Sequence, residues 1–134
     1  MVLILSLYSF SSGDFESRYQ TATAEASSCW NSFYEKHDSK FFKDRAWLFT
    51  EFKRLNPTNS PILTVLEVGC GNGSNVIPLL EASKNSEDYK VYACDFAEKS
   101  VEMVSQNETV KAAGERANIF RHDLSSEDPI PVRK

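Results

Sequence analysis

Short apolar runs alternate with polar, helix-compatible segments in the second half of this chain. Three runs are predicted strands, because they are short, contain branched or aromatic residues and are bounded by turn-forming residues: 64–68, 90–94 and 117–121. The intervening segments carry apolar residues at helical spacing, one from near Ile77 and one over about 97–110. Strand–helix–strand–helix–strand with right-handed crossovers predicts half of a doubly wound parallel α/β sheet.

The first half of the chain has a different pattern, dominated by aromatic residues. Residues 1–14 contain a Ser-Ser-Gly break and are expected to be irregular, whereas 15–28 is predicted to be helical. Trp30, Phe33 and Tyr34 follow at i, i+3 and i+4, so they share one face of a helix. Further aromatic residues follow up to position 52, and the simplest interpretation is a helical segment that packs on the core.

A loop separates this aromatic segment from the predicted sheet. Residues 56–61 contain two prolines together with Asn and Ser, which are typical loop residues. We therefore expect three parts: an irregular terminus (1–14), a helical cap (15–60) and a sheet-containing domain (61–134).

The most informative stretch follows the first predicted strand: Leu66-Glu67-Val68-Gly69-Cys70-Gly71-Asn72-Gly73. Glycines at alternate positions let a backbone turn sharply and let a ligand approach it closely. A dinucleotide fingerprint has a third glycine where this chain has Ser74. The motif is instead acidic-x-Gly-x-Gly-x-Gly, with Glu67 as the acidic residue. A tight loop without a ligand is the alternative, but the strand before it and the helix after it favour a binding motif.

Two further carboxylates follow the second and third predicted strands. Asp95 lies about 20 residues beyond the glycines, where a nucleoside site has a carboxylate that accepts hydrogen bonds from ribose hydroxyls. Asp123 would accept the exocyclic amine of adenine, with the apolar Leu124 beside the ring. By spacing alone, Asp123 fits a helix cap or a turn equally well. Its agreement with Glu67 and Asp95 favours a nucleoside site.

Composition limits the classes of protein to consider. The chain has 134 residues, 41% of them hydrophobic and 25% charged, as in one ordinary globular domain. Apolar runs are too short for a membrane span, and the apolar start has no basic flank typical of a signal peptide. Three cysteines without metal-ligand spacing fit a reducing compartment, with Cys70 and Cys94 in small buried positions. We expect no metal, no membrane contact and a cytoplasmic location, with the nucleus and mitochondrion as alternatives.

Charge is distributed unevenly. The net charge of −4 argues against attraction of the whole chain to nucleic acid. Residues 36–54 nevertheless contain six Lys and Arg against three acidic residues. Such a segment could contact phosphates, although a mixed charged face is more often only solvated. His37 and His122 receive no role.

Two groups of motifs stand out together. The first group is Trp30-Asn31-Ser32-Phe33-Tyr34, Phe41-Phe42-Lys43-Asp44-Arg45-Ala46-Trp47-Leu48 and Glu51-Phe52. The second is the glycine motif with Pro78-Leu79-Leu80, Tyr92-Ala93-Cys94-Asp95-Phe96 and His122-Asp123-Leu124. Both groups resemble the motifs of the tRNA 3-methylcytidine (N3-cytidine) methyltransferases, a family of class I S-adenosylmethionine (SAM) enzymes. The first group is the more specific, because thousands of unrelated methyltransferases share the glycine motif.

The resemblance implies the amino-terminal half of a Rossmann-like class I methyltransferase fold (strands 1–3), preceded by aromatic-rich helices that contact cofactor and RNA. It implies the following roles: Trp30 and Tyr34 close over SAM, Gly69 and Gly71 approach its methionine part, Asp95 binds the ribose, Asp123 and Leu124 bind the adenine, and Lys43 and Arg45 lie near the cofactor or the RNA. The family methylates N3 of a cytidine in the tRNA anticodon loop, in some cases with seryl-tRNA synthetase as a partner.

The implied reaction needs no evident catalytic base. Neutral cytosine already carries a lone pair on N3, so alignment with the sulfonium methyl is the main demand. Because N3 lies on the pairing edge, the base must be unpaired, and aromatic side chains are suited to stack on it.

The chain departs from the family in its length. It ends where a fourth strand would begin, so we expect a truncated protein that is inactive, or nearly so, on its own. The alternatives are a class I methyltransferase for another substrate and a noncatalytic fragment that binds a partner. A dinucleotide oxidoreductase is less consistent with Ser74 and the aromatic segment.

Overall fold

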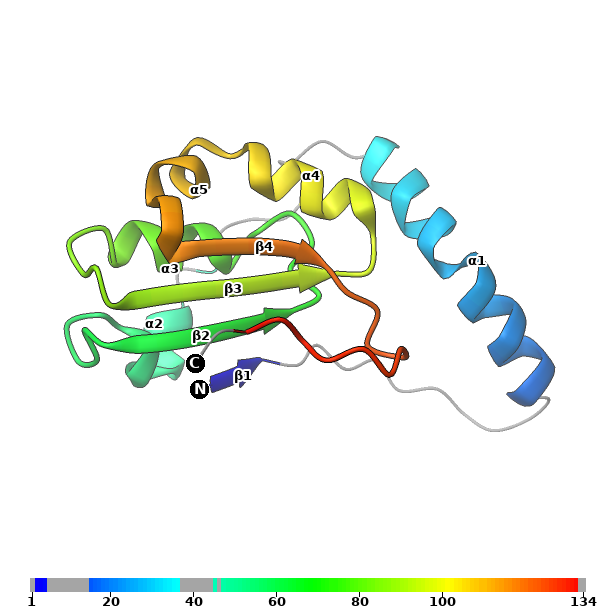
Figure 1. Ribbon diagram of the computed structural model, residues 1–134, viewed down its shortest axis with the longest axis horizontal. Helices are drawn as coiled ribbons and strands as arrows, with labels where there is room; N and C mark the ends of the chain where they lie inside the picture. Colours follow the sequence, from blue (N-terminus) through cyan, green and yellow to red (C-terminus); the bar gives the residue numbers. More distant parts are fainter. Residues whose placement is uncertain (1, 5–14, 37–44, 46, 133–134) are drawn as a thin grey trace.

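The computed structural model describes residues 2–4, 15–36, 45 and 47–132 (Figure 1). Within these residues, a four-stranded parallel sheet has the order β1-β2-β3-β4. The strands are β1 (Val2–Ile4), β2 (Leu63–Val68), β3 (Tyr89–Asp95) and β4 (Ala117–Arg121). The predicted parallel α/β fold is therefore confirmed, and its three predicted strands are β2, β3 and β4.

Strand β1 corrects the expectation that residues 1–14 are irregular throughout. Val2–Ile4 pairs in parallel with Val65, Leu66 and Glu67, so this edge of β2 is covered. An open strand edge has free N–H and C=O groups, which explains why a short apolar run can pair there. Residues 5–14 lie outside the described residues.

Three helices connect the strands: α3 (Val76–Ala82), α4 (Glu98–Gln106) and α5 (Glu108–Ala113). The single helix expected over 97–110 is thus two helices. Asn107 has an extended backbone (φ −65°, ψ 135°) and its side chain accepts a hydrogen bond from the Thr109 N–H at 2.9 Å. Asparagine is a strong N-cap residue, so it ends one helix and begins the next. A short 3₁₀ helix, η3 (Gly114–Arg116), leads into β4.

The amino-terminal half forms one long helix and two short ones. Helix α1 (Phe15–Lys36) contains both segments predicted to be helical and lies beyond the carboxyl ends of β3 and β4 (Figure 1). Helix α2 (Leu48–Glu51) and the 3₁₀ helix η2 (Lys53–Leu55) precede the loop to β2. Much of the Phe41–Leu48 motif falls at 37–44 and 46, outside the described residues.

One face of the sheet packs against α3, α4 and α5 and forms the core. Val65 and Val91 contribute from the strands and are fully buried, as are Leu79 of α3 and Val104 of α4. Leu48 and Leu55 join the same cluster, which attaches α2 and η2 to the sheet. This core fixes the carboxyl ends of β2 and β3, where the predicted binding residues lie.

Candidate functional site

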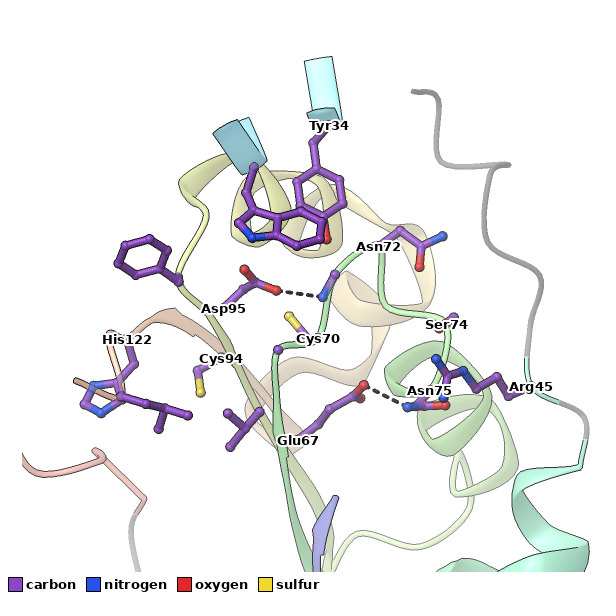
Figure 2. Close-up of a pocket in the computed structure, with 16 residues that line it drawn as sticks. Tyr34, Arg45, Glu67, Cys70, Asn72, Ser74, Asn75, Cys94, Asp95 and His122 are labelled. Atoms are coloured by element: carbon purple, nitrogen blue, oxygen red, sulfur yellow. Dashed lines mark hydrogen bonds between the residues drawn. The ribbon is translucent and has the colours of Figure 1, made fainter. Parts of the chain in front are cut away.

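A pocket of about 390 Å³ lies at the carboxyl ends of β2 and β3 (Figure 2). Its walls come from α1, from Arg45, from the glycine turn and start of α3, and from the ends of β3 and β4. The lining residues are Trp30, Tyr34, Arg45, Glu67, Val68, Gly69, Cys70, Gly71, Asn72, Ser74, Asn75, Cys94, Asp95, Phe96, His122 and Leu124. A pocket of this size fits a small organic ligand.

The glycine turn owes its shape to backbone conformation. Gly69, Gly71 and Gly73 have φ angles of 73°, 55° and 82°, a region that costs other residues free energy. The Gly69 and Cys70 N–H groups both donate to the Cys94 carbonyl, at 2.8 and 3.0 Å. The turn is therefore tied to the end of β3, and its backbone forms one wall of the pocket.

Asp95 connects the glycine turn to α4. Its Oδ2 accepts a hydrogen bond from the Gly71 N–H at 2.8 Å (Figure 2), and its Oδ1 accepts one from the Ala97 N–H at 2.9 Å. A carboxylate offers about four lone-pair positions, so each oxygen can still accept a donor from a ligand. The structure thus places Asp95 in the pocket wall with acceptor capacity to spare.

Glu67 is a buried carboxyl group with one unused oxygen. It is 3% exposed, and its Oε1 accepts a hydrogen bond from Asn75 Nδ2 at 2.9 Å. Within the described part of the chain, Glu67 Oε2 and Asn75 Oδ1 have no hydrogen-bond partner. Burial raises the pKa of Glu67 to about 7, while Asn75 and Arg45 oppose this rise and Asp95 adds to it. Unpartnered buried oxygens in a pocket wall are suited to a donor supplied by a ligand.

The end of α1 covers the other side of the pocket. Trp30 and Tyr34 both line it, with stacked rings whose centroids lie 6.0 Å apart. A Cβ atom built on Gly71 would lie 3.1 Å from the Tyr34 hydroxyl oxygen, so this side chain closely approaches the glycine turn. Burial, with the nearby Asp95 charge, raises the pKa of Tyr34 and keeps its hydroxyl protonated.

Two more of the predicted site residues, Arg45 and Leu124, also line the pocket. The Arg45 backbone N–H donates to the Ser74 carbonyl at 3.4 Å, which brings this residue to the start of α3 (Figure 2). Leu124 is 55% exposed at the opposite rim. Lys43 lies outside the described residues.

Asp123 is not among the pocket-lining residues. Its Oδ1 accepts hydrogen bonds from the Ser125 N–H at 2.8 Å and the Ser125 hydroxyl at 2.7 Å. These bonds hold the pKa of Asp123 below its usual value. The carboxylate therefore makes the turn contacts that its spacing also allowed, and its contact with adenine stays a prediction.

Sequence reasoning missed several pocket residues, including Asn75, Phe96 and His122. Phe96 and His122 directly follow β3 and β4, next to the strand end that Asp95 occupies, and this position was the available signal. Asn75 is the residue before α3, but its role depends on the burial of Glu67 beside it. Such a pairing is visible only in three dimensions.

The described part of the chain contains neither a metal-ligand cluster nor a membrane-spanning helix. Within it, no group of three or more His, Cys, Asp or Glu residues could hold a metal ion. No described helix is both long enough and apolar enough to span a membrane. Cys70 and Cys94 are buried and free, as expected, and Cys29 is exposed and free.

The sheet, glycine turn and strand-end carboxylate together define the amino-terminal half of a Rossmann-like methyltransferase fold. Comparison with known proteins agrees with this class. The tRNA N(3)-methylcytidine methyltransferase Mettl2 of Drosophila melanogaster is 44% identical over 92 residues, or 65% of this chain and 27% of that protein. The tRNA N(3)-cytidine methyltransferase METTL6 of Homo sapiens is 38% identical over 114 residues, or 83% of this chain and 38% of that protein.

A yeast protein gives the same result. The tRNA N(3)-methylcytidine methyltransferase trm141 of Schizosaccharomyces pombe is 42% identical over 110 residues, or 81% of this chain and 42% of that protein. No protein-family profile matches the chain. The chain is a relative of the tRNA N(3)-cytidine methyltransferases, which confirms the resemblance, and it spans less than half the length of these three relatives.

Proposed function

We propose that this chain is the cofactor-binding part of a SAM-dependent methyltransferase that forms 3-methylcytidine in the anticodon loop of tRNA. The relatives carry the name of this reaction, and methylation requires a methyl donor. The observation that carries the proposal is the pocket between the glycine turn and Asp95, with the unused Glu67 oxygen in its wall.

The residues of the pocket fit SAM. Gly71 has no side chain where the ligand would pass, and Asp95 has free acceptor positions for two ribose hydroxyls. Glu67 Oε2 is a buried acceptor suited to the ammonium group of the methionine part. Phe96 and Leu124 supply apolar surface for the adenine ring. Asp123 accepts from Ser125 through Oδ1 alone, so its Oδ2 keeps acceptor capacity for the adenine amine.

The contribution of this chain to catalysis is orientation and exclusion of water. Bound SAM supplies a methyl group activated by its sulfonium. The cytosine N3 lone pair can attack without prior loss of a proton, so the site needs no general base, and we assign no catalytic residue. Trp30 and Tyr34 cover the pocket, limit the access of water and restrict the orientation of a bound ligand.

The RNA side of the proposal involves Arg45 and Lys43. Arg45 reaches the pocket rim, where it could contact a phosphate of an inserted nucleotide. The tRNA anticodon arm as substrate, and seryl-tRNA synthetase as an auxiliary partner, are part of this proposal.

Isothermal titration of SAM into the purified 134-residue chain tests the cofactor site. We expect binding in the micromolar range, weakened at least about tenfold in Asp95→Asn, because the amide NH2 would face one of the two backbone donors, Gly71 or Ala97, and one acceptor for the ribose would be lost. The matched control is Asp88→Ala, an exposed carboxylate in the turn before β3, which should bind SAM normally. Circular dichroism checks that each variant is folded. A folded chain that binds no SAM, or equal binding by all variants, would contradict the proposal.

A further inference from the structure

An exposed aromatic pair lies on the segment that follows Arg45. Trp47 and Phe52 are 49% and 43% exposed, and their ring centroids are 6.4 Å apart. Five large hydrophobic side chains of the described residues are exposed to this degree, and three of these are aromatic. Two of these three aromatic residues form this pair, and packing in the core does not account for their position.

The segment that carries the pair is firmly attached to the protein. Leu48 and Leu55 are 1% and 0% exposed and belong to the main core. The Tyr89 hydroxyl, from β3, donates to the Leu55 carbonyl at 2.6 Å. The inward side chains thus fix α2 and η2 while Trp47 and Phe52 remain at the surface. A surface that is already ordered loses little conformational freedom on binding.

Basic residues outnumber acidic ones in the described part of this segment, with Arg45, Lys53 and Arg54 against Glu51. The Arg45 guanidinium lies 5.7 Å from the centroid of the Trp47 ring, within the range of a cation–π contact. Lys53 and Arg54 follow directly and are exposed, and no salt bridge to either is formed within the described residues. Arg45 also lines the pocket, so the aromatic pair is continuous with the pocket rim.

We propose that Trp47 and Phe52, with Arg45, Lys53 and Arg54, form a stacking surface for unpaired bases of single-stranded RNA at the pocket rim. Each base has a π face that can stack on an aromatic ring, and the cations can neutralise adjacent phosphates. Aromatic residues and Arg also occur in protein interfaces, but Lys53 and Arg54 form no salt bridge within the described residues, which favours a polyanionic partner. This proposal rests on the proposed function for its substrate class and adds the surface that holds the RNA.

Tryptophan fluorescence can test this surface. The chain has two tryptophans, so Trp30→Phe leaves Trp47 as the only reporter. We expect a single-stranded oligocytidine RNA to quench Trp47, whereas duplex RNA of the same length should quench it much less. In anisotropy titrations with labelled oligocytidine, Phe52→Ala should weaken binding about 5- to 100-fold, the loss typical of one stacking residue. Lys53→Ala should weaken it less and reduce the salt dependence.

Matched controls separate stacking from general effects. Ile62→Ala removes an exposed hydrophobic side chain outside the patch, and Lys90→Ala removes an exposed cation on β3. Both should bind RNA as the unmodified chain does. RNA binding without Trp47 quenching, or with full affinity in Phe52→Ala, would overturn the proposal. Failure of the folded chain to bind RNA at low salt would also overturn it and would favour a protein partner.

SAM titration of the same variants distinguishes this proposal from the proposed function. Phe52 does not line the pocket, so Phe52→Ala should bind SAM normally. Asp95→Asn should lose SAM without losing the RNA-induced quenching of Trp47. SAM binding without RNA binding would reject the stacking surface alone, and RNA binding without SAM binding would reject the cofactor site alone.

Discussion

The glycine turn and the end of α1 border the same pocket, but different forces hold them in place. The turn is held by backbone: three glycines with positive φ, two N–H groups on the Cys94 carbonyl, and one on Asp95. The end of α1 is held by side chains, namely the Tyr34 hydroxyl, which lies close to Gly71, and the Asn31 side chain, which accepts a hydrogen bond from the Lys99 N–H of α4. Substitutions in the glycine turn should therefore lower the free energy of unfolding strongly, and substitutions at the end of α1 should lower it only weakly.

Gly73→Ala should have the largest effect. Its Cβ would lie 3.2 and 3.3 Å from the two Val104 methyl groups, at a φ of 82°. Backbone strain of about 1–2 kcal/mol and crowding of about 1–3 kcal/mol should both lower the free energy of unfolding, as measured by urea denaturation. Gly69→Ala is the matched control, because its φ is 73° but no atom lies within 4 Å. Equal losses in the two variants would show that close packing of the turn on α4 contributes nothing.

Glu67→Gln should change how stability depends on pH. The folded pKa of about 7 lies above that of an unfolded glutamate, so protonation favours the folded state. The unmodified chain should lose up to roughly 3 kcal/mol of unfolding free energy as the pH rises from 4 through 7. Glutamine does not titrate and can still accept a hydrogen bond from Asn75. The variant should therefore lose much less unfolding free energy over the same pH range. Urea denaturation at pH 5 and pH 8 measures the unfolding free energy of the unmodified chain and of the variant. An equal change with pH in the two proteins would contradict the effect that we assign to the burial of Glu67.

Tyr89→Phe should weaken the attachment of the aromatic segment to the core. The substitution leaves the buried Leu55 carbonyl without its donor, which costs about 1–3 kcal/mol of unfolding free energy. Tyr92→Phe is the matched control, because Tyr92 is 7% exposed on the same strand and its hydroxyl makes no hydrogen bond within the described residues. Thermal denaturation of both variants gives the comparison. A Tyr92 variant that loses as much as the Tyr89 variant would point to packing rather than the hydrogen bond.

Asn31→Ala should have the smallest effect on stability. It removes the acceptor of the Lys99 N–H, a 3.2 Å contact between α1 and the first turn of α4. We expect a loss of about 0.5–1.5 kcal/mol and faster hydrogen exchange at the Lys99 amide. Ser32→Ala changes an exposed neighbour and should leave that amide unaffected. If the Lys99 amide exchanges equally fast in both variants, this hydrogen bond does not position α1, and the contact of Tyr34 with the glycine turn is the alternative.

The sequence by itself determined the features that depend on local chemistry. Alternate glycines specify a turn because only glycine takes positive φ without strain, and short branched runs specify buried strands. The strands β2, β3 and β4, helix α3, and the places of Gly71 and Asp95 in one pocket followed from these rules. In each case the deciding interactions lie within a few residues, or follow from the alignment of parallel strand ends.

Only the tertiary structure decided the features that need contacts between distant residues. Strand β1 forms because the edge of β2 offers unpaired backbone groups about 60 residues further along the chain. Asn75 joins the pocket because burial leaves Glu67 in need of a donor, and Trp47 pairs with Phe52 because Leu48 and Leu55 face the core. The spacing of Asp123 permitted both a pocket role and a turn role; the structure shows its turn contact with Ser125, and its contact with adenine stays a prediction. Burial and partner geometry arise from the packed chain, so no local pattern could specify them.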